Sequence, residues 1–387
     1  MDLAFTEEEE AFVGQVRVWL AENLELPPPF ASLDEEIEWG RAWQAKLAAG
    51  RWVGIHWPAR YGGRSASPVQ VAIFNMEYAR SRALQPVNRV GINLAGPTLL
   101  AHGTEEQRRR WLPPILDARE LWCQLFSEPG AGSDLASLTT RATPGDGGWL
   151  LSGQKVWTSY ARQARWGICL ARTDPEAPKH RGLSYFVVDM ESPGIDVRPL
   201  VQLTGEAEFN EVFLDDVFVP AGHLVGGLNQ GWTVANTTLA HERGAAFPFK
   251  EQVVHEVYLD QLYALAAQRG ALDAPETADA LAQAFVELRV LRLHNWRTLS
   301  RLARGIEPGA ESSWVKLAWT DMTQHVSESA LTVLGDTAPL WSGGAGNPAD
   351  GKWQRQWLWS KAASIAGGTS EVQRTIIGER ILGLPRE

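Results

Sequence analysis

The sequence is poor in cysteine, in positive charge and in long apolar runs. It has only two cysteines in 387 residues, Cys123 and Cys169, and no Cys/His cluster with metal-ligand spacing, so we expect neither a disulfide framework nor a metal site. The formal net charge of −10 argues against a nucleic-acid partner, which requires a basic face to neutralise phosphates. Without a run of about 18 apolar residues, the sequence predicts no membrane insertion.

No basic leader is visible at the N-terminus. The first residues, "MDLAFTEEEEAF", are acidic where a secretory or transit peptide is basic, which predicts a cytoplasmic protein. The chain is also too long for a single hydrophobic core, so we expect two or three domains.

The texture of the chain changes twice. Residues 1–120 read as helical, beginning with a capping box in which Thr6 caps the first helix and Glu9 bonds back. Residues 121–229 contain short β-rich runs separated by turn residues. Residues 230–387 return to helical periodicity, with long stretches near 230–247, 250–269, 275–304, 311–334 and 370–383. The sequence therefore predicts a multidomain α+β protein with three domains in the order α, β, α.

Two segments of the β region have residue types suited to binding a ligand. In "CQLFSEPGAGSD" a β-like run ends at Ser127, and the following tight turn offers backbone N–H groups and hydroxyls to an anionic or carbonyl-rich ligand. An ordinary glycine-rich hairpin that binds no ligand would have the same sequence pattern. In "SGQKVWTSYA" the aromatic face of Trp157 precedes Thr158 and Ser159, as in a platform for a planar heterocycle, although a strand tryptophan is often simple core.

Several motifs in order resemble the acyl-CoA dehydrogenase family. They are "FSEPGAGSD", "SGQKVWTS", "FNEVFLDDVFVP" and "GGTSEVQRTIIGERILGLPR", after a helical front third that contains "HGTEEQRRRWLPPI". The resemblance covers essentially the whole chain. It implies an N-terminal helical domain, a central β-barrel-like domain and a C-terminal four-helix bundle, with FAD bound where they meet and a dimeric or tetrameric assembly of like or unlike chains.

The resemblance also assigns site residues by position. It implies that FAD and the acyl-CoA substrate are flanked by Phe126, Ser127, Gly132 and Ser133, with Ser133 and Gly368 toward the substrate. The ring system of FAD would continue along Trp157, Thr158 and Ser159. The start of the last helix, Thr369, Ser370 and Glu371, would also meet the cofactor, as suits the free N–H groups of a helix N-terminus.

The family's reaction needs a carboxylate that removes a proton from Cα of the thioester. Many members carry it in the loop as Tyr-Glu-Gly-Thr, but this chain has Ala366, Gly367, Gly368 and Thr369 there, so only the backbone N–H of Gly367 is left to bind the thioester oxygen. Glu371 is a rival carboxylate, but Arg374 three residues later is an ordinary helix ion-pair partner.

Glu242 is the alternative base. In "GWTVANTTLAHERGAAF" it shares a helical stripe with Trp232, Ala235 and Leu239, without a basic residue three or four positions away. Burial without a salt bridge would raise its pKa toward the working range of a general base. Family members that lack the loop glutamate resemble this arrangement, with the glutamate directly before a helix arginine, here Arg243. We expect Arg243 to orient the acidic site and to bind the substrate; a helix-surface cation is the other interpretation.

The electron acceptor, the alternative functions and part of the FAD contacts complete the sequence-based expectations. An electron-transfer flavoprotein is the acceptor that the resemblance implies. One alternative is a subunit of a heteromeric acyl-CoA dehydrogenase that is inactive or flavin-poor without its partner chain, and another is a flavoprotein with desulfination or monooxygenation chemistry. The Arg-x-x-Phe-Gly segment of many members is absent, and "TVLGD" at 332–336 replaces their Gln-x-x-Gly-Gly turn, so the contacts to FAD pyrophosphate and adenine stay unassigned.

Overall fold

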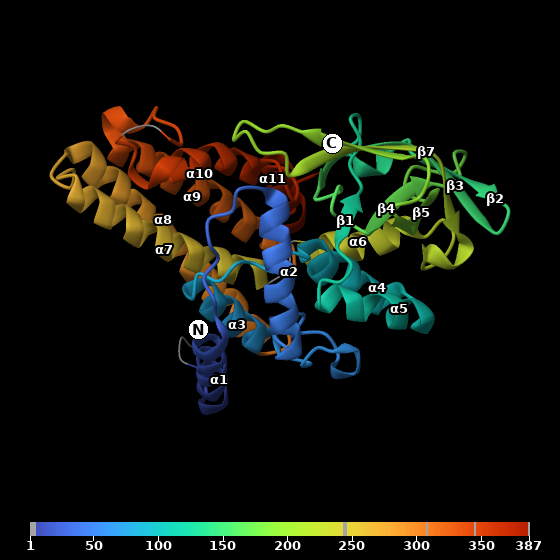
Figure 1. The fold of residues 1–387 in the computed structure, drawn as a ribbon, viewed down its shortest axis with the longest axis horizontal. Helices are drawn as coiled ribbons and strands as arrows, with labels where there is room; N and C mark the ends of the chain where they lie inside the picture. Colours follow the sequence, from blue (N-terminus) through green and yellow to red (C-terminus); the bar gives the residue numbers. More distant parts are fainter. Residues whose placement is uncertain (1–4, 243–245, 307–308, 344–345, 386–387) are drawn as a thin grey trace. The chain divides into compact units, whose positions relative to one another are not determined.

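The computed structural model describes residues 5–242, 246–306, 309–343 and 346–385, with the backbone alone at Glu242 and at 246–248 (Figure 1). Contacts divide the chain into two compact units. One contains Pro27–Ala66 and Leu84–Glu242, and is called here the sheet unit. The other contains Met1–Leu26, Ser67–Ala83 and Arg243–Glu387, and is called the helical unit.

The sheet unit is built on one mixed sheet. In the described residues its strands follow the order β6-β7-β3-β2-β4-β5-β8, and β1 pairs in parallel with β4. The strands are β1 (Trp122–Leu125), β2 (Arg141–Gly145), β3 (Gly148–Ser159), β4 (Trp166–Arg172), β5 (Leu183–Asp189), β6 (Ile195–Leu200), β7 (Phe209–Pro220) and β8 (Leu224–Val225). The helices of this unit are α2 (Leu33–Ala49), α4 (Gly96–His102), α5 (Glu105–Leu116) and α6 (Gly231–Glu242).

Composition explains the central strands of this sheet. β4 and β5 are buried along almost their whole length, and they read as apolar runs because both faces are covered. Cys123 and Cys169 are free thiols within the same core, and burial raises the pKa of Cys169 to about 11. The two cysteines are therefore packing residues. The strands confirm the β region that the sequence predicts.

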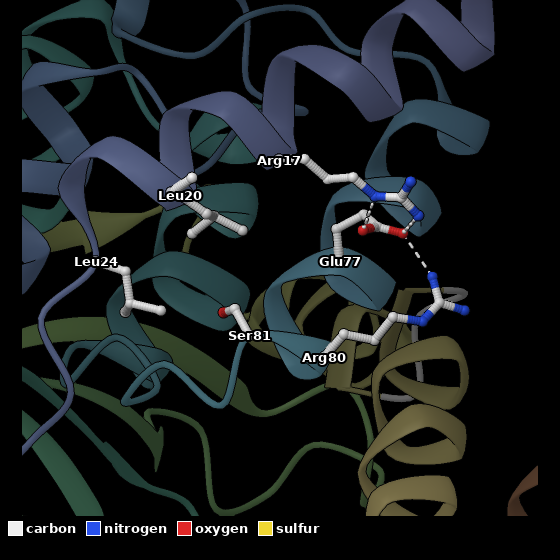
Figure 2. A pocket seen from close by; sticks show the side chains of 7 residues that line it. Arg17, Leu20, Leu24, Glu77, Arg80 and Ser81 are labelled. Atoms are coloured by element: carbon white, nitrogen blue, oxygen red, sulfur yellow. Dashed lines mark hydrogen bonds and ion pairs between the residues drawn. The ribbon is translucent and has the colours of Figure 1, made fainter.

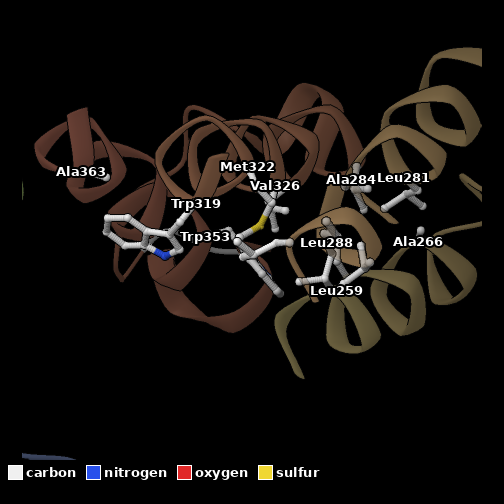
Figure 3. Packing of buried hydrophobic residues seen from close by; sticks show 14 of the residues in the cluster. Leu259, Ala266, Leu281, Ala284, Leu288, Trp319, Met322, Val326, Trp353 and Ala363 are labelled. Atoms are coloured by element: carbon white, nitrogen blue, oxygen red, sulfur yellow. The ribbon is translucent and has the colours of Figure 1, made fainter. Parts of the chain in front are cut away.

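The helical unit contains an apolar core to which four of its helices contribute. Its helices are α1 (Glu7–Asn23), α3 (Pro68–Arg80), α7 (Ala246–Gln268), α8 (Pro275–Leu302), α9 (Glu311–Leu334), α10 (Lys352–Ser360) and α11 (Ser370–Ile376). Figure 3 shows Leu259, Leu288, Met322 and Trp353 converging from α7, α8, α9 and α10. The predicted capping box at Thr6 and Glu9 is present.

The fold prediction is confirmed: helices precede the sheet in the sequence and helices follow it. The domain boundaries after residues 120 and 229 stay a prediction. In the described part of the chain, no helix is both long and apolar enough to cross a membrane.

Candidate active site

Phe126 and Ser127 lie directly after β1, at the end of a strand buried in the sheet. Phe126 is buried, and its ring meets the ring of Tyr185 on β5 edge to face, with 5.8 Å between centroids. The carbonyl of Ser127 accepts a hydrogen bond from the backbone N–H of Val156 on β3 at 2.9 Å. The two motif segments of the β region are therefore neighbours in space.

The loop after Ser127 forms the tight turn that the sequence predicts. Glu128 and Ala131 exchange two backbone hydrogen bonds of 3.1 and 3.0 Å. Gly132 and Ser133 follow at the exposed tip, and a Cβ added to Gly132 would meet nothing within 4 Å. The tip is thus open to a ligand.

Trp157 lies in a strained bulge of β3. The pairing of β3 with β7 shifts register between Lys155 and Thr158, and Trp157 has a φ of +60°, a conformation that is a genuine outlier for a bulky residue. The bulge leaves the Trp157 side chain 62% exposed, with its ring edge to face against Phe209 at 6.1 Å. Strained, exposed aromatic residues of this kind occur where function fixes the backbone.

Thr158 and Ser159 are less exposed than Trp157. Thr158 is buried, its carbonyl accepts from Asn210 at 3.0 Å, and its hydroxyl has no partner in the described residues. Ser159 is half-buried. The hydroxyls of Ser127, Ser133 and Ser159 likewise make no hydrogen bond within the part of the chain that the structure describes, so they are free to bind a ligand.

Helix α6 is anchored through buried hydroxyl groups. The hydroxyl of Thr238 is hydrogen-bonded to the hydroxyl of Thr98 on α4 at 2.8 Å and to that of Tyr185 at 3.1 Å. One residue earlier, Thr237 is hydrogen-bonded to the ring of His102 at 2.7 Å. These contacts fix α6 against α4 and β5 one turn before its last residue, Glu242.

The expected stripe of α6 is only partly observed. Its buried residues are Gly231, Val234, Ala235 and Thr238, whereas Trp232 and Leu239 are half-buried. The side chain of Glu242 and all of Arg243 lie outside the described residues, so the roles assigned to them stay predictions.

The loop of the helical unit that corresponds to the family's base-bearing segment has a left-handed backbone. Gly367 and Gly368 have φ of +65° and +92°. The buried amide of Gln373 donates to their carbonyls at 3.3 and 3.2 Å, and a Cβ on Gly368 would come within 2.7 Å of that amide nitrogen. The backbone N–H of Gly367 has no acceptor in the described residues.

The start of α11 is capped by Thr369. The hydroxyl of Thr369 accepts from the N–H of Val372 at 3.3 Å, and Ser370 is buried. Glu371 is exposed, and hydrogen bonds from its own backbone N–H and from Thr369 lower its pKa. Arg374 lies 3.9 Å from Glu371, which is the ion pair that the sequence predicts.

The predicted residues thus divide between the units. Phe126, Ser127, Gly132, Ser133 and 157–159 belong to the sheet unit, whereas 367–371 belong to the helical unit.

The sequence analysis did not single out Glu128 and Lys155, which join the two motif segments of the sheet unit. Lys155 is completely buried, and its ammonium group lies 2.9 Å from the Glu128 carboxylate. A usable signal was present: Lys155 stands beside the apolar Val156 in a β-like run, and a lysine that a strand buries requires an anionic partner.

Two cavities in the described residues are lined by none of the predicted site residues. One, of about 420 Å³, lies between α1 and α3, where Arg17 and Arg80 both bond to the Glu77 carboxylate beside Leu20 and Leu24 (Figure 2). The second, of about 660 Å³ in the sheet unit, has arginines and glutamates in its wall. In the described residues no group of three or more His, Cys, Asp or Glu side chains could hold a metal ion.

Comparison with known proteins identifies the family. Models of the acyl-CoA dehydrogenase N-terminal, middle and C-terminal domains match residues 6–119, 123–217 and 229–382. The chain belongs to the acyl-CoA dehydrogenase family. It is therefore an oxidoreductase that acts on CH–CH donors, and members of the family are FAD flavoproteins.

Its relatives include acyl-CoA dehydrogenases from mycobacteria. Acyl-CoA dehydrogenase IpdE1 of Mycobacterium tuberculosis is 42% identical, covering 98% of each chain. FadE34 of the same organism is 43% identical over 89% of this chain and 46% of its own length.

Two solved structures have a similar fold over the whole of both chains. They are the Tcur3481-Tcur3483 steroid acyl-CoA dehydrogenase, with a TM-score of 0.86 and 28% identity, and the ChsE4-ChsE5 complex from Mycobacterium tuberculosis, with 0.84 and 30%.

The sheet unit fits the flavin that this acyl-CoA dehydrogenase requires. An isoalloxazine ring presents carbonyl oxygens and ring nitrogens around a planar apolar body, so a site needs a few polar groups beside an aromatic surface. The unpartnered hydroxyls of Ser127, Ser133 and Ser159 and the exposed ring of Trp157 supply both. These residues would hold the flavin.

Proposed function

We propose that this acyl-CoA dehydrogenase introduces an α,β double bond into an acyl-CoA thioester. The thioester loses a proton from Cα and a hydride from Cβ, and bound FAD supplies the hydride acceptor at N5. The protein's own part is to take the proton with a carboxylate and to stabilise negative charge on the thioester oxygen.

Glu242 is the proposed base. The observation that carries this assignment is Gly367, which has no side chain and a left-handed φ of +65° at the position where many members have glutamate. The removal of the loop carboxylate requires another source for the base. Glu242 follows Thr238 by one helical turn, and the hydroxyl contacts of Thr238 hold that end of α6 in place.

The Gly367 N–H is the proposed donor to the thioester oxygen. A backbone donor does not depend on the side chain, and this N–H has no acceptor among the described residues. Glycine at φ +65° pays no steric penalty, so the loop can present the donor without strain. Arg243 and Gly368 are proposed on the substrate side, together with Ser133.

An anaerobic titration with saturated acyl-CoA thioesters tests the base. The visible flavin band of the wild type should bleach, whereas Glu242→Gln should retain FAD and not bleach. Glu276→Gln, an exposed carboxylate in the first turn of α8, is the matched control and should bleach like the wild type. Full bleaching of Glu242→Gln would remove Glu242 as the base.

A bulky or branched acyl group is the proposed substrate class. Gly367 leaves space near the substrate Cα that a glutamate would fill, and one structural relative is named a steroid acyl-CoA dehydrogenase. The same titration, run with short linear, branched and steroid-like thioesters, should show the fastest bleaching with the last two. Preference for short linear thioesters would overturn this part of the proposal.

We also propose assembly with at least one further subunit of this family, identical or different. Two structural relatives are titled as pairs of chains. On α8, Phe285, Val286, Val290 and Leu293 form an apolar stripe that is 43–53% exposed, as an unpaired subunit interface would be. Sedimentation of the purified chain distinguishes a homo-oligomer from a flavin-poor monomer that requires another chain. An electron-transfer flavoprotein is the proposed acceptor, and a cytoplasmic location stays a prediction.

A further inference from the structure

Lys155 carries a fully buried positive charge between the two motif segments of the sheet unit. Its ammonium donates to the carbonyl of Phe126 at 3.0 Å, to the carboxylate of Glu128 at 2.9 Å and to the carbonyl of Leu170 at 2.9 Å. An ammonium has three N–H donors, so all of them are used. Lys155 therefore has one defined position, two residues before the bulge at Trp157.

Glu128 uses the same ion pair to close the loop that follows it. Its carboxylate accepts from the backbone N–H and the hydroxyl of Thr139 at 2.7 and 2.8 Å, and from the backbone N–H of Thr140 at 2.9 Å. Residues 128–140 are thus tied at both ends by one side chain. Gly132 and Ser133 lie within this closed loop.

Stability alone does not account for this pair. Two buried charges are expensive to desolvate, and an apolar pair of the same volume is often as stable or more so. Charge-assisted hydrogen bonds, however, are directional and fix positions that apolar contacts leave adjustable. Here they fix the Phe126 carbonyl, the loop of Ser133 and the strand that leads to Trp157.

We infer that Glu128 and Lys155 are positioning residues for flavin binding: they hold 126–133 and 157–159 in mutual register although neither belongs to the predicted set of flavin contacts. The inference rests on the proposed assignment of those two segments to FAD. Apart from the bonds of Lys155, the backbone bond from Val156 to Ser127 is the hydrogen bond that joins the two segments in the described residues.

The first test is the affinity of the purified full-length protein for FAD and the shape of its visible flavin band. Lys155→Met should weaken FAD binding by about tenfold or more and shift or blur the band, since one buried charge is then left unpaired. Lys179→Met, which removes the exposed partner of Asp134 on the same loop, should change neither.

A charge-free double variant keeps the inference testable if Lys155→Met folds poorly. Glu128→Gln/Lys155→Met removes both charges, so it should recover stability but still bind FAD more weakly than the wild type. A double variant with wild-type FAD affinity and flavin spectrum would show that the pair is only structural, and would overturn the inference. A wild-type protein that binds no FAD, either alone or together with a partner subunit of the family, would instead contradict the proposed function.

The pH dependence of FAD binding gives a second readout. In Lys155→Met the buried Glu128 carboxylate has lost its cation, so its protonation becomes favourable and FAD binding should strengthen as the pH falls from about 8.5 to 5.5. Among the residues that the structure describes, the Cys169 thiol on β4 also interacts with both charges, and its pKa of about 11 keeps it neutral in this range. The wild type and the double variant should show no such dependence, and a flat profile in Lys155→Met would count against the inference.

Discussion

The two halves of the predicted site are held in shape by different forces. In the sheet unit, buried charges and hydroxyls fix the positions of the segments around Ser127, Trp157 and the end of α6. In the helical unit, the loop at 367–369 depends on backbone conformation, on one buried amide and on a helix cap. Substitutions in the sheet half should therefore reduce stability strongly. The helical half should tolerate substitutions that are compatible with its backbone conformation.

Breaking the buried ion pair should have the largest effect. Lys155→Met leaves Glu128 charged without its cation, and the loss of stability should be about 3–5 kcal/mol at neutral pH. Urea denaturation of wild type and variant measures it, with Lys179→Met as the exposed control. A loss of stability near zero in Lys155→Met would mean that buried charge does not hold the sheet half in shape.

Acid should remove the same contribution from the wild type. Burial opposes the ionisation of Glu128, but Lys155 and the bonds from Thr139 and Thr140 outweigh it and lower the pKa to about 2 from an ordinary value of 4.5. A lowered pKa stabilises the folded state above the unfolded-state pKa, and the contribution disappears as the pH falls from about 4.5 to 2.

The expected size of this acid effect is about 3 kcal/mol. Stability measured across that pH window should fall less steeply in Glu128→Gln/Lys155→Met than in the wild type. Parallel profiles would assign the acid sensitivity to other carboxylates.

A neutral substitution in the sheet half should cost less. Thr238→Val keeps the shape but leaves the buried Tyr185 hydroxyl without its Thr238 partner, so it should destabilise by about 1–3 kcal/mol. Thr233→Val, on the exposed face of the same helix, is the matched control and should stay within about 0.5 kcal/mol of the wild type. Chemical denaturation of both variants measures the two losses of stability. Equal losses would mean that the hydrogen bonds of the Thr238 hydroxyl do not anchor α6.

How far the sequence predicts this molecule depends on the kind of interaction. The capping box at Thr6 and Glu9 is a local pattern, and it appears as expected. Helix α10 was not predicted, because at nine residues "KWQRQWLWS" is shorter than the window of about 11–18 residues in which an apolar period can be recognised.

Longer-range features of the site were harder to predict. The buried face of α6 includes Thr238, whose burial depends on partners in α4 and β5 that a hydropathy pattern does not contain. Glu128 and Lys155 are 27 residues apart, and only the strand pairing brings them together. Sequence motifs thus locate the segments proposed to bind flavin, whereas the contacts that hold these segments in place depend on the fold.

The helical half offers a test of backbone conformation. Gly367→Ala places a Cβ on a residue with φ of +65°, which should cost about 1 kcal/mol. Gly378→Ala is the control in the last helical segment, where a Cβ meets only Leu384 at 3.6 Å, and it should be neutral or stabilising. Thermal unfolding of the two variants should therefore change in different directions, and a harmless Gly367→Ala would mean that the loop can adopt another conformation.

The smallest effect should come from the exposed ion pair at the start of α11. Glu371 and Arg374 are 3.9 Å apart with most of both side chains in solvent, and the leading causes of the lowered Glu371 pKa are hydrogen bonds from its own backbone and from Thr369. Arg374→Met should therefore leave the Tm within about 2 °C of the wild type. Glu371→Gln, in contrast, alters a predicted flavin contact and should weaken FAD binding at an unchanged Tm. If Arg374→Met weakened FAD binding as much as Glu371→Gln, the pair would act as a unit at the cofactor, and the helical half would depend on charge as the sheet half does.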